Sequence, residues 1–176
     1  MTIQLEQLIK HYESLHDGDL SAIGLQPKMD SLGIWTEGWG SVVYDGNNRV
    51  IRGIENKSKA YACAKNKTEL DAQIDLESKV NRMEANVRAI VNKNLSLKQY
   101  QIDALTDFAY NCGVGSLKSS TALRLINKGD LSGVDALLKW NNAKDAKGNM
   151  IELKGLTYRR QSEIHLFKTG EVKFFN

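Results

Sequence analysis

The sequence of 176 residues contains one proline, two cysteines and three histidines, and no long uninterrupted run of apolar residues. The absence of an apolar stretch of about 18 residues excludes a transmembrane helix. Two cysteines, Cys63 and Cys112, are too few for a disulfide framework and lack metal-ligand spacing. We therefore expect them to be small core residues of a protein made in a reducing compartment, and we expect no metal site.

The charge is nearly balanced, with 24 basic and 21 acidic residues and a net charge of +3. Nucleic-acid-binding proteins carry a larger and more clustered positive charge, so this class of partner is excluded. A mildly positive chain is compatible with a polyanionic cell wall as partner. With 41% hydrophobic and 26% charged residues, the composition is that of one globular domain, which at this length buries roughly 70% of its unfolded surface.

Residues 3–15 form the first predicted helix, because apolar residues recur at helical spacing and Thr2 is available as the N-cap. Glu13 lies about 40° beyond Ile9 around the helix, on the border of the apolar stripe. Such a position half-buries the carboxyl group, and desolvation raises a carboxyl pKa, so that the group can act as a general acid near neutral pH. The alternative is an ordinary solvated glutamate. The apolar stripe consists of Leu5, Leu8, Ile9, Tyr12 and Leu15.

The helix is followed by a predicted loop that contains Pro27, the only proline of the chain. Asp17 and Asp19 resemble the start of a calcium-binding loop. The residues that follow them, and the lack of a closing glutamate at the right distance, break that pattern. A calcium site is therefore not predicted.

A β-strand is predicted over residues 34–44, followed by a turn at 45–48 and a second strand at 49–51. Gly38 and Gly40 lie inside the first of these strands. Glycine in a strand indicates close approach by another group, such as a ligand or a twisted neighbouring strand. The hairpin is therefore a candidate wall of a binding site.

Residues 30–40 read Asp-Ser-Leu-Gly-Ile-Trp-Thr-Glu-Gly-Trp-Gly and follow the helix that carries Glu13. This pattern resembles the active-site signature of the phage-type lysozymes, the muramidase family that includes the lysozymes of T-even phages and many endolysins. Cleavage of a glycosidic bond needs one carboxylic acid that protonates the leaving oxygen and a second polar group that manages water or positive charge. The resemblance implies that Glu13 is the acid, with Asp30 and Thr36 on the other side of the sugar and Trp39 as a substrate-binding residue.

The sequence departs from the family pattern at three places. The segment between Glu13 and Asp30 is longer than usual, so we expect residues 17–29 to bulge out and form part of the rim of the cleft. Position 37, which is commonly apolar in the family, is Glu37 here. Position 41, where the family often has a histidine after the Gly-x-Gly, is a serine. Strand alternation directs Glu37 to the face opposite Thr36, so we interpret it as a supporting or surface residue rather than a catalytic one.

Two helices are predicted after the hairpin, a short one at 58–65 and a long one from 68 to about 93. Thr68 and Asp71 form a variant of the capping box at the start of the long helix. This helix is expected to connect an N-terminal lobe to a C-terminal helical lobe, as the resemblance implies. Its predicted core stripe consists of Leu70, Ile74, Val80, Met83, Val87 and Ile90.

Two further blocks resemble the same family, at residues 99–115 and 155–163. The first is a predicted buried helix that begins after a capping box at 96–99 and ends at glycine. Asn111 near its end either faces the cleft or caps the helix. Further helices are predicted at about 121–126 and at 134–140. Ser120 is one of the residues expected to cap the first of these two helices.

Trp140, at the end of the second of these helices, either packs in the core or lines a sugar site. The polar residues 141–154 are predicted to form a loop.

Arg159 and Arg160 stand in the third block, which opens the last predicted helix. In phage-type lysozymes the first arginine of this motif commonly faces the catalytic glutamate. We therefore expect Arg159 to orient Glu13, and Arg160 to pair with Glu163 on the helix surface. The alternative is that both arginines are solvated.

The predicted fold class is α+β, mostly helical and lysozyme-like. We expect one domain over 1–176, with an N-terminal β-containing lobe at about 1–67, a connecting helix at about 68–94 and a helical lobe at about 95–176. The resemblance implies hydrolysis of the β-1,4 bond between N-acetylmuramic acid and N-acetylglucosamine, with no cofactor and in a monomer. The alternatives are a lytic transglycosylase and a non-catalytic module that binds peptidoglycan or belongs to a virion.

The N-terminal residues enter a helix directly and show no signal peptide or anchor. We therefore expect the protein to accumulate in the host cytoplasm without membrane insertion. It would reach peptidoglycan in the periplasm only after the membrane has been permeabilised, which implies a helper protein of the holin type.

Overall fold

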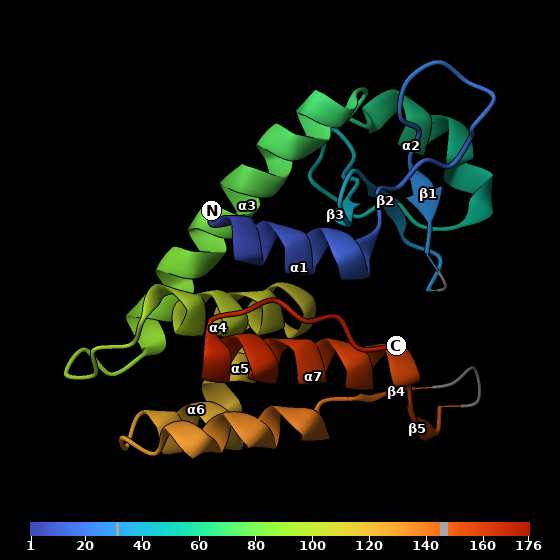
Figure 1. Cartoon of the computed structure of the whole chain (residues 1–176). Coiled ribbons are helices and arrows are strands. Elements are labelled where there is room, and N and C mark those ends of the chain that lie inside the picture. Colours follow the sequence, from blue (N-terminus) through green and yellow to red (C-terminus); the bar gives the residue numbers. More distant parts are fainter. Residues whose placement is uncertain (31, 145–147) are drawn as a thin grey trace. The chain divides into compact units, whose positions relative to one another are not determined.

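The computed structural model describes residues 1–30, 32–144 and 148–176 (Figure 1). Helices predominate, and the strands are short and antiparallel, which confirms the predicted mostly helical α+β class. The elements in chain order are α1 (Ile3–Glu13), β1 (Lys28–Met29), β2 (Trp35–Glu37), β3 (Ser41–Val42), η1 (Ile54–Asn56), α2 (Lys57–Cys63), α3 (Glu69–Ile90), α4 (Gln99–Cys112), α5 (Val114–Ser119), α6 (Thr121–Ile126), η2 (Leu131–Lys139), β4 (Asn142–Lys144), β5 (Met150–Glu152) and α7 (Lys154–Thr169).

The chain divides into two compact units. One consists of Glu13–Lys79, and the other combines Met1–Tyr12 with Val80–Asn176. We expected the first helix to belong to the same lobe as the hairpin. In the structure, helix α1 up to Tyr12 belongs to the same compact unit as the C-terminal helices. The physical reason is packing, since Leu8 is fully buried within the core of those helices. The assignment of 1–176 to a single domain stays a prediction.

The sheet of the Glu13–Lys79 unit has the order β1-β2-β3, with all neighbours antiparallel. Thr36 at its centre pairs with Lys28 on one side and with Val42 on the other. The predicted continuous strand over 34–44 is wrong, because the chain turns at residues 38–40 between β2 and β3. Gly38 and Gly40 have φ angles of +53° and +83°, which L side chains rarely adopt. The glycines therefore mark a tight turn, and strand β1 was not predicted.

The predicted turn at 45–48 is confirmed, because the amide of Asp45 donates to the carbonyl oxygen of Arg49 at 2.9 Å. The Lys59 ammonium, the Arg49 amide and the Arg49 guanidinium hold the pKa of the Asp45 carboxyl well below its ordinary value. Beneath this hairpin lies a small core against which Met29, Tyr61 and Cys63 pack. Its buried residues are Trp35, Val43, Ile51 and Ala60.

The two helices predicted after the hairpin are present as α2 and α3. Thr68 Oγ1 accepts from the amide of Asp71 at 3.1 Å, and the Asp71 carboxylate accepts from the amide of Thr68 at 2.9 Å, so the capping box is confirmed. The predicted core stripe is wrong at its start, because Leu70 and Ile74 are exposed. Among the described residues, no helix is both long and apolar enough to cross a membrane.

The other unit is a helical bundle in which α7 packs against α4 and η2, and α6 packs against η2 (Figure 1). The predicted burial of this helix is confirmed at Ala104, Leu105, Phe108 and Ala109, which are fully buried, whereas Tyr100, also expected to face the interior, is half-buried. The capping box of this helix lies two residues later than predicted. Its N-cap is Lys98, whose amide donates to the Gln101 side chain at 2.9 Å.

The connection from α6 to α7 contains elements that the sequence predicted only in part. Ser120 caps α6 as expected by accepting from the amide of Leu123 at 3.0 Å. The helix predicted at 134–140 is the longer 3-10 helix η2. Trp140 packs, with its ring edge-to-face on Phe108 at a centroid distance of 5.6 Å. Part of the predicted loop at 141–154 forms the two-stranded sheet β4-β5. Residues 145–147 of the predicted loop lie outside the described residues.

Candidate active site

Glu13 is the last residue of α1 and is half-buried, as predicted. Thr2 caps the start of this helix by accepting from the amide of Leu5 at 3.1 Å. The helix ends at Glu13 because Ser14 adopts a left-handed conformation with φ of +56°. The carboxylate of Glu13 faces the turn between β2 and β3, where a Cβ atom built on Gly40 would lie 3.0 Å from Glu13 Oε2.

Substitution of Gly40 by alanine tests whether this turn fixes the glutamate. The new methyl group would crowd the Glu13 carboxylate and would also occupy a φ of +83°. We expect a loss of about 1–3 kcal/mol in stability and a lower rate of cleavage. The control is Gly46→Ala, because a Cβ at Gly46 meets no atom within 4 Å. Equal thermal stability and activity of the two variants would contradict the role of the turn.

Asp30 holds the short loop between β1 and β2. Its Oδ1 atom accepts from the backbone amides of Leu32 and Ile34, both at 2.8 Å. The amide of Asp30 donates to the carbonyl oxygen of Ile34 at 2.8 Å. No described residue donates a hydrogen bond to Oδ2 of Asp30. One carboxylate oxygen is therefore structural, and the other is available to a water molecule.

Thr36 is buried in the centre of the sheet and contacts His16. Its hydroxyl donates to the carbonyl oxygen of Lys28 at 3.0 Å and lies 2.7 Å from His16 Nδ1. Because the hydroxyl has a single proton, His16 Nδ1–H donates to Thr36 when Thr36 donates to Lys28. The amide of His16 donates to the carbonyl oxygen of Gly38 at 2.8 Å, which anchors the histidine to the hairpin turn.

His16 is a site residue that the sequence did not predict. Burial lowers its pKa, the charges of Glu13 and Asp30 raise it, and the charge of Lys28 lowers it further. The three residues predicted to act together, Glu13, Asp30 and Thr36, therefore all influence this one imidazole ring. The signal was absent from the sequence because the hydrogen-bond partners of His16 are Thr36 on β2 and Gly38 in the turn after it, about 20 residues further along the chain.

The titration of His16 predicts a dependence of stability on pH. Because the folded chain holds the pKa of His16 below its ordinary value of 6.5, the unfolded chain binds more protons between the two pKa values. Stability therefore rises with pH across this interval and is lost as the pH falls from 6.5 toward the folded pKa. We expect the unfolding temperature of His16→Asn to change less between pH 7.5 and pH 5 than that of the wild type. The control is the exposed His11→Asn, and the same pH dependence in both variants would contradict the assignment.

Glu37 is a buried structural residue and not a surface residue, which corrects one of the two roles considered for it. Its Oε2 atom accepts from the backbone amides of Lys65 and Asn66 at 2.6 and 2.7 Å. These amides follow α2, so the carboxylate joins strand β2 to the connection between α2 and α3. These hydrogen bonds agree with the supporting role expected for Glu37.

Ser41 belongs to a second connection between the hairpin and α3. Its hydroxyl donates to the Asp75 carboxylate, and Lys79 Nζ donates to the Ser41 oxygen at 2.9 Å. Asn66 Nδ2 lies 3.4 Å from the same Asp75 carboxylate, and a Cβ built on Gly38 would lie 2.7 Å from that nitrogen. The turn beside Glu13 is therefore held from α3 by a polar network.

Arg159 and Arg160 form a buried ionic cluster within the helical unit. Arg159 donates to both carboxylate oxygens of Asp107, at 2.9 and 3.0 Å, and is only 3% exposed. Arg160 Nη2 lies 2.5 Å from Glu163 Oε1, so the predicted pair is confirmed, but it is fully buried and not on the surface. The alternative of two solvated arginines is wrong.

The two carboxyl groups of this cluster have opposite pKa shifts. Burial raises the pKa of Glu163, and the neighbouring Asp107 carboxylate raises it further. Burial also opposes ionisation of Asp107, but the Arg159 guanidinium holds its pKa below the ordinary value. Asp107 is therefore the ionised partner of Arg159. The expected role of Arg159 beside Glu13 stays a prediction, because these residues belong to different units.

The two remaining predicted site residues lie in different surroundings. Trp39 is half-buried at the tip of the turn between β2 and β3. Asn111 is exposed near the end of α4, where its Oδ1 atom accepts from Arg160 Nη2 at 3.0 Å. Binding of substrate by either residue stays a prediction. Within the described ranges, no group of three His, Cys, Asp or Glu side chains is arranged to hold a metal ion.

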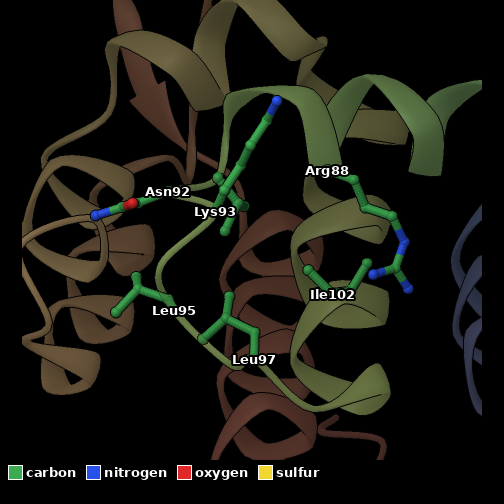
Figure 2. A pocket seen from close by; sticks show the side chains of 7 residues that line it. Arg88, Asn92, Lys93, Leu95, Leu97 and Ile102 are labelled. Carbon is green, nitrogen blue, oxygen red and sulfur yellow. The ribbon is translucent and has the colours of Figure 1, made fainter.

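A small cavity of about 150 Å³ lies in the helical unit, where α3 leads into α4 (Figure 2). Two of its polar lining residues have partners in the protein, and the first of them, Arg88, binds Glu84 and Gln99. Asn92 donates two hydrogen bonds to Asn127, from its backbone amide to Oδ1 at 2.8 Å and from Nδ2 to the carbonyl oxygen at 3.0 Å. The rest of the lining is mainly aliphatic. This cavity offers no titratable acid, and it is not the candidate active site.

A family model described as phage lysozyme matches residues 19–163, which is most of the chain. The chain belongs to the phage lysozyme family. The match begins after Glu13, so it includes Asp30 and Thr36 but not the predicted acid.

Several curated phage proteins are similar to this member of the phage lysozyme family. An endolysin of Bacillus phage B103 is 44% identical over 80 residues, which cover 45% of this chain and 28% of the relative. An endolysin of Acyrthosiphon pisum secondary endosymbiont phage 1 is 38% identical over 89 residues, 49% of this chain and 60% of the relative. A SAR-endolysin of Bacteriophage PS119 is 36% identical over 94 residues, which cover 46% of this chain and 53% of the relative. The match spans less than two thirds of each relative.

Solved structures resemble the chain over almost its whole length. An endolysin from Escherichia coli O157:H7 phage FAHEc1 superposes with a TM-score of 0.74 at 22% identity, covering 98% of this chain and 95% of the other. The muramidase domain of SpmX from Asticaccaulis excentricus superposes with a TM-score of 0.69 at 26% identity. This match covers 96% of this chain and 97% of the other. The first of these likenesses shows the shared fold.

Proposed function

We propose that this phage lysozyme family member cleaves bacterial peptidoglycan by hydrolysing the β-1,4 bond between N-acetylmuramic acid and N-acetylglucosamine. The observation that carries the proposal is the gathering of Glu13, Asp30 and Thr36 around His16 within one compact unit. A pair of carboxyl groups on the two sides of the scissile bond is what most glycoside hydrolases use, and the Thr36 hydroxyl adds a further polar group here. The endolysin and muramidase names of the relatives support the same activity.

In the proposed mechanism, Glu13 protonates the oxygen of the leaving sugar as the glycosidic bond breaks. The turn at Gly40 fixes the position of the acid. The Oδ2 atom of Asp30 and the remaining lone pair of the Thr36 hydroxyl accept hydrogen bonds from the attacking water, and the Asp30 carboxylate stabilises positive charge on the sugar. His16 keeps the Thr36 hydroxyl in place through the contact of 2.7 Å.

Product analysis tests this proposal. Isolated peptidoglycan is incubated with the purified protein, and the released fragments are identified by mass spectrometry. Hydrolysis adds one water molecule and leaves reducing muramic acid ends, which is the result that we expect. Anhydro ends would replace the hydrolase with a lytic transglycosylase. Binding to the wall without release of fragments would replace it with a non-catalytic module.

The place of action follows from the same proposal. The endolysin names of the relatives support a role in lysis of the host cell, with the cell wall as the site of action. We propose that the protein acts as a monomer, and that a helper of the holin type gives it access to the wall. Addition of the protein to intact and to membrane-permeabilised cells measures this dependence.

A further inference from the structure

The loop between α1 and β1 carries two large aliphatic side chains that face solvent. Leu20 is 89% exposed and Ile23 is 102% exposed, so water surrounds both side chains along their whole length. Ala22 beside them is also exposed. Single exposed aliphatic residues are common on protein surfaces, but two on the tip of one loop form a candidate interaction surface. We call residues 20–23 the loop tip.

The base of this loop is fixed to the rest of its compact unit. The amide of Gly18 donates to the carbonyl oxygen of Gln26 at 2.9 Å, which closes the loop on itself. The amide of Leu25 donates to the carbonyl oxygen of Lys67 at 2.8 Å. Gly24 has a φ of +80°, and a Cβ atom there would lie 2.6 Å from the same oxygen, so glycine is required for this close approach. The loop tip is therefore held out from a clamped base.

Two exposed lysines stand beside the loop and meet at Tyr61 of α2. The ammonium of Lys57 lies 5.2 Å from the centre of the Tyr61 ring. Lys67 Nζ donates to the carbonyl oxygen of Tyr61 at 2.8 Å, and the backbone of Lys67 carries the loop through its bond to Leu25. Lysine and tyrosine beside exposed aliphatic residues are the combination that suits the boundary between lipid headgroups and acyl chains.

The two acidic residues of the loop are turned toward the loop itself. Asp17 and Asp19 are half-buried, and their Oδ1 atoms accept hydrogen bonds from backbone amides of the loop. The bonds from Ser21, and to a smaller extent the charge of Lys57, lower the pKa of the Asp19 carboxyl. The lysines are exposed, whereas these carboxylates are partly covered, so an anionic surface can approach the loop from the side of the lysines.

We propose that the loop tip binds the surface of an anionic phospholipid membrane, with Leu20 and Ile23 among the acyl chains and Lys57 and Lys67 at the phosphate groups. Leucine and isoleucine side chains have no group that hydrogen-bonds to a sugar, whereas an acyl chain offers them apolar surface. Two aliphatic side chains and two charges give reversible attachment and not a permanent anchor. This inference goes beyond the proposed function, because the membrane is not the substrate of the candidate active site.

Co-sedimentation with lipid vesicles tests the proposal. We expect the wild-type protein to bind vesicles of phosphatidylethanolamine and phosphatidylglycerol, less so at high salt, and to bind vesicles of phosphatidylcholine weakly. Leu20→Ser combined with Ile23→Ser should weaken binding at least roughly tenfold, and Lys57→Ala about fivefold. The control is Ile3→Ser combined with Leu131→Ser, which changes two aliphatic residues of the other unit that are 73% and 41% exposed. No binding by the wild type, or equal binding by the two double variants, would overturn the proposal.

Assays without lipid separate this inference from the proposed function. The double variant of the loop tip should cleave isolated peptidoglycan as fast as the wild type does. Slower cleavage with unchanged vesicle binding would make the tip a rim of the cleft and overturn the membrane surface. Self-association of the wild type that depends on the tip, without vesicle binding, would assign the tip to a second copy of the chain. Vesicle binding that depends on the tip, without any cleavage of peptidoglycan, would support the membrane surface and refute the enzyme.

Discussion

Glu13→Gln is expected to lower the rate of peptidoglycan cleavage by about 10²–10⁴-fold, the range typical of loss of a general acid. Glutamine keeps the size and shape of the side chain, but its amide protons are not acidic enough to be transferred to the leaving oxygen. Its contact with the turn at Gly40 is retained, so we expect the unfolding temperature to stay close to that of the wild type. Turbidity of permeabilised cells and release of reducing ends measure the rate.

The matched control is Glu6→Gln, two turns earlier on the same helix. Glu6 forms an ion pair with Lys10 at 2.8 Å, and its loss should cost only a few tenths of a kcal/mol. Cleavage by this variant should equal that of the wild type. If Glu13→Gln cleaves as fast as Glu6→Gln, Glu13 is not the acid and another carboxyl group must protonate the leaving sugar.

Arg159→Ala is expected to destabilise the folded protein by about 3–5 kcal/mol, the range measured when one partner of a buried pair is removed. Asp107 is fully buried and would lose both hydrogen bonds from the guanidinium. Chemical denaturation measures the free energy of unfolding. The control is Arg88→Ala, because Arg88 pairs with Glu84 on the exposed surface of α3 and should contribute at most about 1 kcal/mol.

The size of this effect changes how activity data on Arg159 should be interpreted. Loss of cleavage in Arg159→Ala would follow from unfolding alone, so it would not show that the arginine orients Glu13. Activity must be compared at a temperature at which both variants are fully folded. Equal stability of Arg159→Ala and Arg88→Ala would contradict the importance of the buried pair.

Local signals in the sequence predicted most of the helices. Caps such as Thr2 and Ser120 and the glycine after α4 depend only on neighbouring residues, and the structure contains them. The helical spacing was less informative on the amphipathic α3, where Ala72 and Leu76 are buried and Leu70 is exposed. The sequence could not decide between these faces, because burial of a helix depends on which neighbour covers it.

The candidate site was predictable only as far as its motif extended. Glu13, Asp30 and Thr36 came from one short pattern, and they belong to one compact unit. His16 escaped prediction because its contacts with Thr36 and Gly38 depend on pairing between distant segments. The turn at residues 38–40 was misread as strand, because a glycine that bends the chain and a glycine that admits a neighbour look the same in sequence.

The grouping of helix α1 with the C-terminal helices has a consequence for the order in which the protein is made. Residues 13–79 form their unit from one continuous stretch, which can fold as soon as it has left the ribosome. Residues 3–12 are synthesised first, yet Tyr12 bonds to Ser162 of α7 at 2.6 Å and His11 stacks on Phe174. The helix that ends in Glu13 therefore gains these neighbours only when α7 and Phe174 have been translated, and a chain truncated before α7 lacks them.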